Sequence, residues 1–370
     1  MNHVNLLRQT LKPHLQWHGA RLSFLALFLI ALFRVKTVNL AELSTGFMGS
    51  AKTESNYKRL QRFLREFDLD YYSLAKLVIT MMEIPEPWVL SVDRTNWQFG
   101  SKVFNILTLG VVYRGVAFPL LWWMLDKKGN SNTKERIELI EEFIELFSEQ
   151  KISYLSADRE FLGHEWLKYL LSQPMMPFRI RIRETDLLGD GQHELSTRIV
   201  FSHLKIGQVE LLSKKRTLWG HKVYVGALRL EDNSLLTVIA PNYSSCMIDE
   251  YAQRWGIETL FGIFKSRGFN LEDTHLTDSE RLSRLFALLT IALCWAYRTG
   301  QWLCEQKPIK IKKHGRKQTS IFRCGFDYLR RIFFNLEQSE SDFCQTLKFL
   351  SSNQRIDIDV SISQMPNSFT

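Results

Sequence analysis

Hydrophobic positions in residues 1–82 recur at helical spacing, with no clear strand pattern among them. The most apolar run, Leu22 to Phe33, has twelve residues and lies between Arg21 and Arg34. A membrane-spanning helix needs roughly 20 apolar residues. Basic residues ahead of the run leave a targeting segment open, but no small-residue cleavage site follows it. We therefore favour a buried core helix.

The pattern changes to short strands after Pro85 and Pro87. Apolar runs at 88–92, 103–112 and 116–125 predict a three-stranded antiparallel meander. A helix with a capping box at Asn132 and Glu135 follows, and then a strand at 152–157. The order β-β-β-α-β is that of an RNase H-like sheet. The sequence thus predicts an α/β protein whose mixed sheet is flanked by helices.

Residues 172–242 are again rich in strand patterns and predict a β insertion in this core. Within it, Phe178 to Arg183 alternates strictly between apolar and basic residues. One face would carry Arg179, Arg181 and Arg183, which suits either phosphate contacts or an ordinary exposed strand face.

The 370 residues carry a formal net charge of +9, and 45 % of them are hydrophobic, so a soluble globular chain with a polyanionic partner is favoured. Residues 1–80 hold 11 Lys and Arg against 5 Asp and Glu, and residues 301–330 hold 8 against 2. The five cysteines show no CxxC pair, which favours reduced thiols over disulfides or a zinc site.

These features predict three regions. A helical DNA-binding domain covers 1–82, the catalytic core covers 83–306, and a basic loop with a helical C-terminal region covers 307–370. The basic amphipathic stretch Ser55 to Arg65 in the first region is open to two interpretations, a solvated helix packed on a core or a DNA-binding helix.

Two aspartates end short apolar strands, Asp93 in Ser-Val-Asp-Arg-Thr and Asp158 in Ser-Ala-Asp-Arg-Glu-Phe. A carboxylate at a strand end faces the cleft beyond the sheet edge. One such aspartate is often only a cap, but two in the first and fourth strands of this order indicate a site.

A polar stripe runs through residues 251–265. At 100° per residue, Tyr251, Arg254, Glu258 and Lys265 fall within an arc of about 60° on one helix face, with Trp255 at its edge. The alternative is a solvated face with an Arg254–Glu258 ion pair. Because the other faces are apolar, we favour a helix whose polar face lines a site.

The pattern Tyr-x2-Arg-x3-Glu-x6-Lys resembles the hallmark motif of the insertion-sequence four family of bacterial transposases. The resemblance extends over roughly residues 85–300, to Asp93 with Thr95, to Asp158, and to the β insertion before the glutamate. It implies a DDE enzyme with an RNase H-like catalytic core, working in the bacterial cytoplasm near the nucleoid.

The resemblance also implies the roles of the residues. Asp93, Asp158 and Glu258 would be the catalytic residues and would hold two Mg²⁺ ions about 3.5–4 Å apart, with Mn²⁺ as a substitute. Arg254, Lys265 and Tyr251 would contact DNA phosphates, although Arg254 could instead only orient Glu258. Thr95 would either support Asp93 or serve as a turn hydroxyl.

Relatives cut the element end through a DNA hairpin, in which an aromatic residue replaces a base. Trp255 is the candidate by motif. The strand at 235–240 lacks the second tryptophan that the family often has there, and Trp219 is the nearest. The implied partners are terminal inverted repeats, target DNA and a second subunit in a synaptic homodimer, with no membrane.

The sequence disfavours two other functions. A catalytically silent DNA-binding regulator is disfavoured because all three carboxylates are present. A paired-carboxylate glycoside hydrolase explains neither the net charge nor the cationic residues around Glu258.

Overall fold

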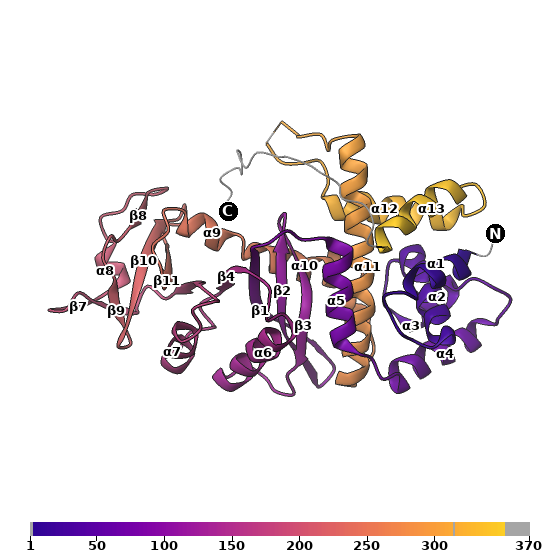
Figure 1. Ribbon diagram of the computed structural model, residues 1–370, viewed down its shortest axis with the longest axis horizontal. Coiled ribbons are helices and arrows are strands. Elements are labelled where there is room, and N and C mark those ends of the chain that lie inside the picture. Colours follow the sequence, from indigo (N-terminus) through magenta and orange to yellow (C-terminus); the bar gives the residue numbers. More distant parts are fainter. Residues whose placement is uncertain (1–2, 314, 352–370) are drawn as a thin grey trace.

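A large mixed sheet forms one half of the elongated molecule, and the N- and C-terminal helices together form the other half (Figure 1). The computed structural model describes residues 3–313 and 315–351. This arrangement confirms the predicted mixed α/β fold with helical regions at both ends. Residue 314 of the predicted basic loop and residues 352–370 of the predicted C-terminal region lie outside the described residues.

The first region is entirely helical in its described part. The apolar run Leu22–Phe33 lies in α2 and is buried, as predicted, except for Ser23. No single helix among the described residues is long and apolar enough to cross a bilayer, and α2 and α3 pass that test only as a pair bent by 103°. The helices are α1 (His3–Leu11), α2 (Gly19–Val35), α3 (Leu40–Gly46), α4 (Thr53–Glu66) and α5 (Tyr71–Met82).

The predicted meander is present as β1 (Trp88–Phe99), β2 (Lys102–Tyr113) and β3 (Val116–Met124), all antiparallel. Arg114 and Gly115 turn between β2 and β3 with φ of 47° and 82°, as hairpin turns of this type require. β1 does not end at Asp93, as we predicted, but continues six residues further to Phe99 because β2 pairs with its whole length.

The central sheet continues from β1 through two parallel neighbours, in the order β3-β2-β1-β4-β5. The capping box at the start of α6 (Thr133–Leu146) is formed as predicted. β4 (Ile152–Ala157), α7 (His164–Leu171) and β5 (Phe178–Ile182) follow. β5, which we placed in the insertion, pairs directly with β4, so the inserted strands begin after it.

The inserted strands extend this sheet instead of forming a separate one. β11 pairs with β5, and the order then runs β10-β9-β6-β7, with β8 paired to β10. These strands form the far end of the molecule (Figure 1). The elements are β6 (Leu187–Gly189), β7 (Glu194–Ser196), α8 (Thr197–Val200), β8 (Val209–Leu211), β9 (Arg216–Leu218), β10 (His221–Arg229) and β11 (Leu235–Ala240).

The motif at 251–265 is not one regular helix, contrary to our prediction. α9 (Met247–Ala252) ends in a tight turn, in which the amide of Arg254 bonds to the carbonyl of Tyr251 at 2.9 Å. α10 (Trp255–Gly262) then widens into the five-residue π-helix η1 (Ile263–Arg267). The tight turn redirects the chain from the inserted strands, where α9 packs, toward β1 to β3, where α10 packs.

A buried helix, α11 (Ser279–Gln306), connects the two halves of the molecule after the short 3-10 helix η2 (Leu271–Asp273). It packs on β3 and α5 on one side and on α2, α4 and α12 (Ile321–Phe334) on the other. Figure 1 shows α5 and α11 between the sheet and the N-terminal helices. The chain continues to α13 (Glu340–Leu347) and the 3-10 helix η3 (Lys348–Leu350).

The crossing of α11 and α12 depends on glycine. A Cβ at Gly300 would lie 2.0 Å from the carbonyl oxygen of Ile321. We therefore expect Gly300→Ala to cost at least about 3 kcal/mol in the free energy of unfolding, above the usual range for overpacking. Thermal and chemical denaturation measure this. Gly19→Ala is the matched control, since nothing lies within 4 Å of its added Cβ. Equal stability of the two variants would contradict the packing described.

Candidate active site

Two neighbouring parallel strands bring the predicted aspartates to the same edge of the sheet. The parallel pairing of β1 with β4 ends at Val92 opposite Ala157. Asp93 and Asp158 are the next residues of the two strands. Parallel strands run in the same direction, so these carboxylates leave the paired region side by side.

Arg254 joins two of the three predicted carboxylates. One terminal nitrogen of its guanidinium lies 3.0 Å from Asp93 Oδ2, and the other bonds to Glu258 Oε1 one helical turn away. The hydroxyl of Tyr251 donates to Asp158 Oδ1 at 3.4 Å. The tight turn between α9 and α10 thus places the Tyr, Arg and Glu of the motif over the ends of β1 and β4.

Burial controls the electrostatics of this cluster. It raises the pKa of Asp93 to about 7, although Arg254 opposes the shift. Burial alone would lower the pKa of Arg254, but Tyr251 and the surrounding carboxylates raise that pKa above its ordinary value. Arg254 is 7 % exposed and stays charged. This geometry favours the orienting role for Arg254 over a free phosphate clamp.

A second ion pair, which the sequence did not reveal, ties together the segments that follow the two aspartates. Arg94 bonds in bidentate fashion to Glu160, with Nε–Oε1 at 3.3 Å and Nη2–Oε2 at 3.2 Å. It also donates to the side-chain oxygens of Asn105 and Asn130. Its side chain is 9 % exposed. Each aspartate is therefore followed, within two residues, by one partner of the same half-buried bridge.

Further hydrogen bonds hold the loops around the Arg94–Glu160 bridge. The amide of Asn105 donates to the carbonyls of Lys127 and Gly129 after β3. Arg136, buried in the first turns of α6, donates to the Glu160 carbonyl at 3.0 Å and lies over the Phe161 ring. Sequence reasoning missed these residues because their partners are distant along the chain. Of these residues, the sequence marked only Arg94, because it directly follows Asp93.

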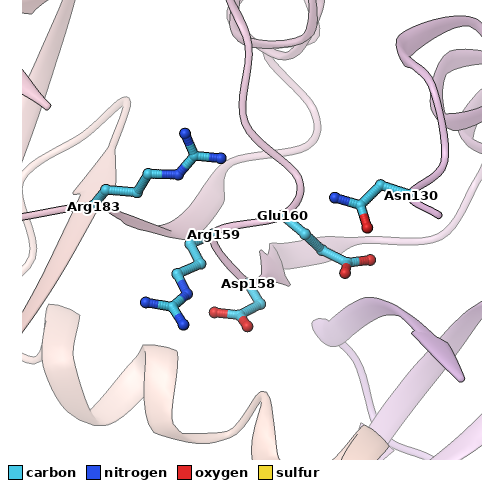
Figure 2. Close-up of a pocket in the computed structure, with 5 residues that line it drawn as sticks. All are labelled: Asn130, Asp158, Arg159, Glu160 and Arg183. Carbon is cyan, nitrogen blue, oxygen red and sulfur yellow. The ribbon is translucent and has the colours of Figure 1, made fainter. Parts of the chain in front are cut away.

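A polar cavity of about 360 Å³ opens beside Asp158. Asn130, Asp158, Arg159, Glu160 and Arg183 line it. Figure 2 shows Arg159 and Arg183 on one side of the cavity and Glu160 and Asn130 on the other. Both arginines are exposed, so this cavity can accept an anionic group next to a candidate catalytic carboxylate.

The three strand arginines do not form the exposed basic face that we predicted. Arg179 is buried, pairs with Glu250 of α9, and stacks on Tyr154 at 5.2 Å. Its charge is paired inside the protein, which disfavours the predicted contact of Arg179 with DNA. Arg181 is half-buried, and its positive charge opposes the rise that burial causes in the pKa of Tyr251. Arg183 alone is exposed, at the cavity.

The other predicted residues lie around the cluster at different places. Lys265, in η1, donates to the Asn96 carbonyl at 2.7 Å and pairs with Glu272, so its ammonium group is directed at β1 and not at the three carboxylates. Trp255 is 62 % exposed beside Arg254. Trp219 is half-buried at the hairpin between β9 and β10. Thr95 is buried two residues after Asp93 in β1.

The carboxylates fit Mg²⁺ by chemistry, since this ion prefers oxygen ligands. Within residues 3–313 and 315–351, however, no three His, Cys, Asp or Glu side chains are grouped closely enough to hold a metal ion. In this structure the guanidinium of Arg254 pairs with Asp93 and with Glu258. A metal ion bound by both residues would have to share these oxygens with Arg254 or displace it.

Comparisons with known proteins place this geometry in a family. The model of the transposase DDE domain matches residues 84–295, more than half of the chain. No curated protein matches. A cryo-EM structure of the piggyBac transposase synaptic complex with hairpin DNA is similar, with 10 % identity, a TM-score of 0.48, and coverage of 97 % of this chain and 84 % of that one. By its matching domain, the chain belongs to the transposase DDE domain family.

Proposed function

We propose that this protein is the transposase of a bacterial insertion sequence of the insertion-sequence four type, with an RNase H-like catalytic core. It binds the terminal inverted repeats, cleaves their DNA strands and joins them to target DNA, as a homodimer in the cytoplasm near the nucleoid. One observation carries the proposal: Asp93, Asp158 and Glu258 come from three elements to one sheet edge, around Arg254.

Asp93, Asp158 and Glu258 would hold the divalent ions. When bound, Mg²⁺ or Mn²⁺ supplies positive charge to the scissile phosphate and activates the attacking oxygen. The protein's own residues do the rest. Arg94 and Glu160 hold the two aspartate segments in register, Tyr251 orients Asp158, and Arg254 orients Glu258.

DNA contacts are proposed for exposed basic residues near and beyond the site. Arg183 and Arg159 flank the cavity beside Asp158. Lys58 and Arg62 form an exposed face of α4, and the exposed loop after α11 carries Lys307, Lys310, Lys312, Lys313 and Lys317. Trp255 is exposed to solvent beside Arg254. Its aromatic ring could stack there on an unpaired base.

One observation favours the alternative of a catalytically silent DNA-binding regulator. Arg254 occupies oxygens of Asp93 and Glu258 that a metal ion would use. The two functions differ in a single measurable property, metal-dependent cleavage of the DNA ends.

The first prediction from this proposed function concerns the carboxylates. Asp93→Asn, Asp158→Asn and Glu258→Gln should each lower Mg²⁺-dependent cleavage of the element's ends more than about 100-fold, beyond the effect typical of a residue that only supports a metal ligand. End binding, measured by gel shift, should persist. Asp68→Asn, at an exposed position, is the control. Wild-type protein that binds ends but never cleaves them would establish the silent regulator instead.

The second prediction tests the Arg94–Glu160 bridge. Arg94→Gln and Glu160→Gln should each raise the Mg²⁺ concentration needed for half-maximal cleavage by about 10- to 100-fold. The double variant should be no worse than either single one, because the two residues act as a pair. If the losses add, or if only the melting temperature changes, the bridge has no positioning role. A far larger loss for Glu160→Gln alone would make Glu160 a direct ligand.

The third prediction concerns Trp255. Trp255→Ala removes an exposed ring, so the melting temperature should stay within about 1 °C of the wild-type value. First-strand nicking should continue, while conversion of the nick to a hairpin falls. Denaturing gels of labelled ends separate the two products. Tyr72→Ala in α5, also an exposed aromatic residue, is the control. Normal hairpin yield in the Trp255 variant would remove this residue from the base-stacking role.

A further inference from the structure

A second polar feature lies far from the carboxylates, along the seam between α2 and α12. The seam is closed by aromatic packing, with Phe33 of α2 at 5.2 Å from Phe326 and 5.7 Å from Phe333 of α12. Figure 1 shows these helices in the half of the molecule opposite the inserted strands. Packing here brings the C-terminal end of α2 beside the outer face of α12.

Four cationic side chains converge on this seam, and we call them the cationic patch. Arg34 and Lys36 come from the end of α2, and Arg323 and Arg330 come from α12. Arg34 and Arg330 lie over the same ring, that of Phe334, at 5.9 and 5.2 Å, and this ring is 53 % exposed. Lys36 lies 5.9 Å from the Phe326 ring. All four cations are partly exposed.

The patch has too few acidic partners for its charge. In the described part of the chain, one carboxylate pairs with it, Asp327, at 2.7 Å from Arg323. Asp273 lies nearby but accepts a hydrogen bond from Thr37. Burial and the repulsion of Arg323 and Arg330 lower the pKa of Lys36, so these cations are close enough to oppose one another. An anion bound here would relieve that repulsion.

The backbone at Lys36 adopts a conformation that glycine prefers. Lys36 caps α2 in the left-handed region, with φ of 61° and ψ of 27°. Glycine is the usual residue in this conformation because it has no Cβ to strain. A lysine here places a charge at the seam at the expense of local backbone stability.

We propose that the cationic patch binds the phosphate backbone of duplex DNA outside the catalytic site. The proposal rests on the proposed function. It gives that function a contact shared by the N-terminal helices and α12, which neither region forms alone. The exposed lysines of the loop after α11 precede α12 along the chain, and Ser320, the N-cap of α12, lies one turn before Arg323.

The experiment measures the salt dependence of binding to a fluorescein-labelled 30-base-pair duplex of random sequence, because phosphate contacts do not depend on sequence. Each contact contributes a slope of about 0.9 in log Kd against log salt. Between 50 and 200 mM salt, one contact thus accounts for about a 3.5-fold loss of affinity. Lys36→Gly, Arg330→Gln, their double variant and Asp327→Asn are compared with wild type.

The measured quantity is the factor by which affinity falls between 50 and 200 mM salt. We expect this factor to be about 3.5-fold smaller in each single cation variant than in wild type, and about 12-fold smaller in the double variant. Asp327→Asn should act in the opposite direction and tighten binding. Lys36→Gly should also melt at or above the wild-type temperature, because glycine removes the backbone strain. Lys134→Ala is the matched control, since Lys134 is an exposed lysine on α6, away from the seam.

Wild-type slopes in both cation variants, with wild-type protein binding the duplex, would overturn the patch and leave the proposed function intact. Failure of wild-type protein to bind any duplex would overturn both. Loss of binding to phosphatidylserine vesicles with unchanged DNA binding would assign the patch to a membrane surface and also overturn the proposal. If Lys36→Gly folds poorly, the salt dependence of duplex binding by Arg330→Gln and Asp327→Asn tests the proposal.

Discussion

The contact of one guanidinium with Asp93 and Glu258 is the constraint on which the candidate site depends. Two carboxylates that lie close together, with Asp93 buried, need either a cation or a proton to compensate their charge, and removing one partner of a buried ion pair typically costs about 3–5 kcal/mol. The planar fork of Arg254 presents one nitrogen to each carboxylate. To reach both, α10 must lie directly against the sheet. Gly256 permits this, since a Cβ there would come within 2.8 Å of Val112.

The site is rigid because its acidic residues are held by pairs that cross between elements. Arg94 and Glu160 join the segments after β1 and β4, and Arg136 ties the Glu160 backbone to α6. Arg179 serves the same purpose on the other side, since its pair with Glu250 fixes α9, which carries Tyr251. Carboxylate oxygens that are held in this way keep their geometry before any ligand binds, as a catalytic site requires.

Local patterns in the sequence predicted the meander, the capping box of α6 and the strand-end position of Asp158, because each depends on neighbouring residues. They could not predict that β1 continues past Asp93, which depends on its pairing with the distant strand β2. A regular helical wheel brought Tyr251, Arg254 and Glu258 together correctly, but it failed at Lys265, where the backbone becomes a π-helix. Alternation in β5 identified the face that carries Arg179, but not the half-buried Glu250 that pairs with it.

The net charge of +9 does not measure the positive charge that is available to an outside partner. Arg94, Arg179 and Arg254 are neutralised within the protein, so they attract no polyanion from solvent. The charges left to act on a polyanion are those of partly exposed cations, such as the four of the cationic patch. Two of the four cations of that patch lie on α12, which packs on α11, and α11 in turn packs on β3 of the central sheet. A single buried helix therefore fixes the separation between the cationic patch and the carboxylates, and DNA bound at both places would have its position along the protein set by the fold.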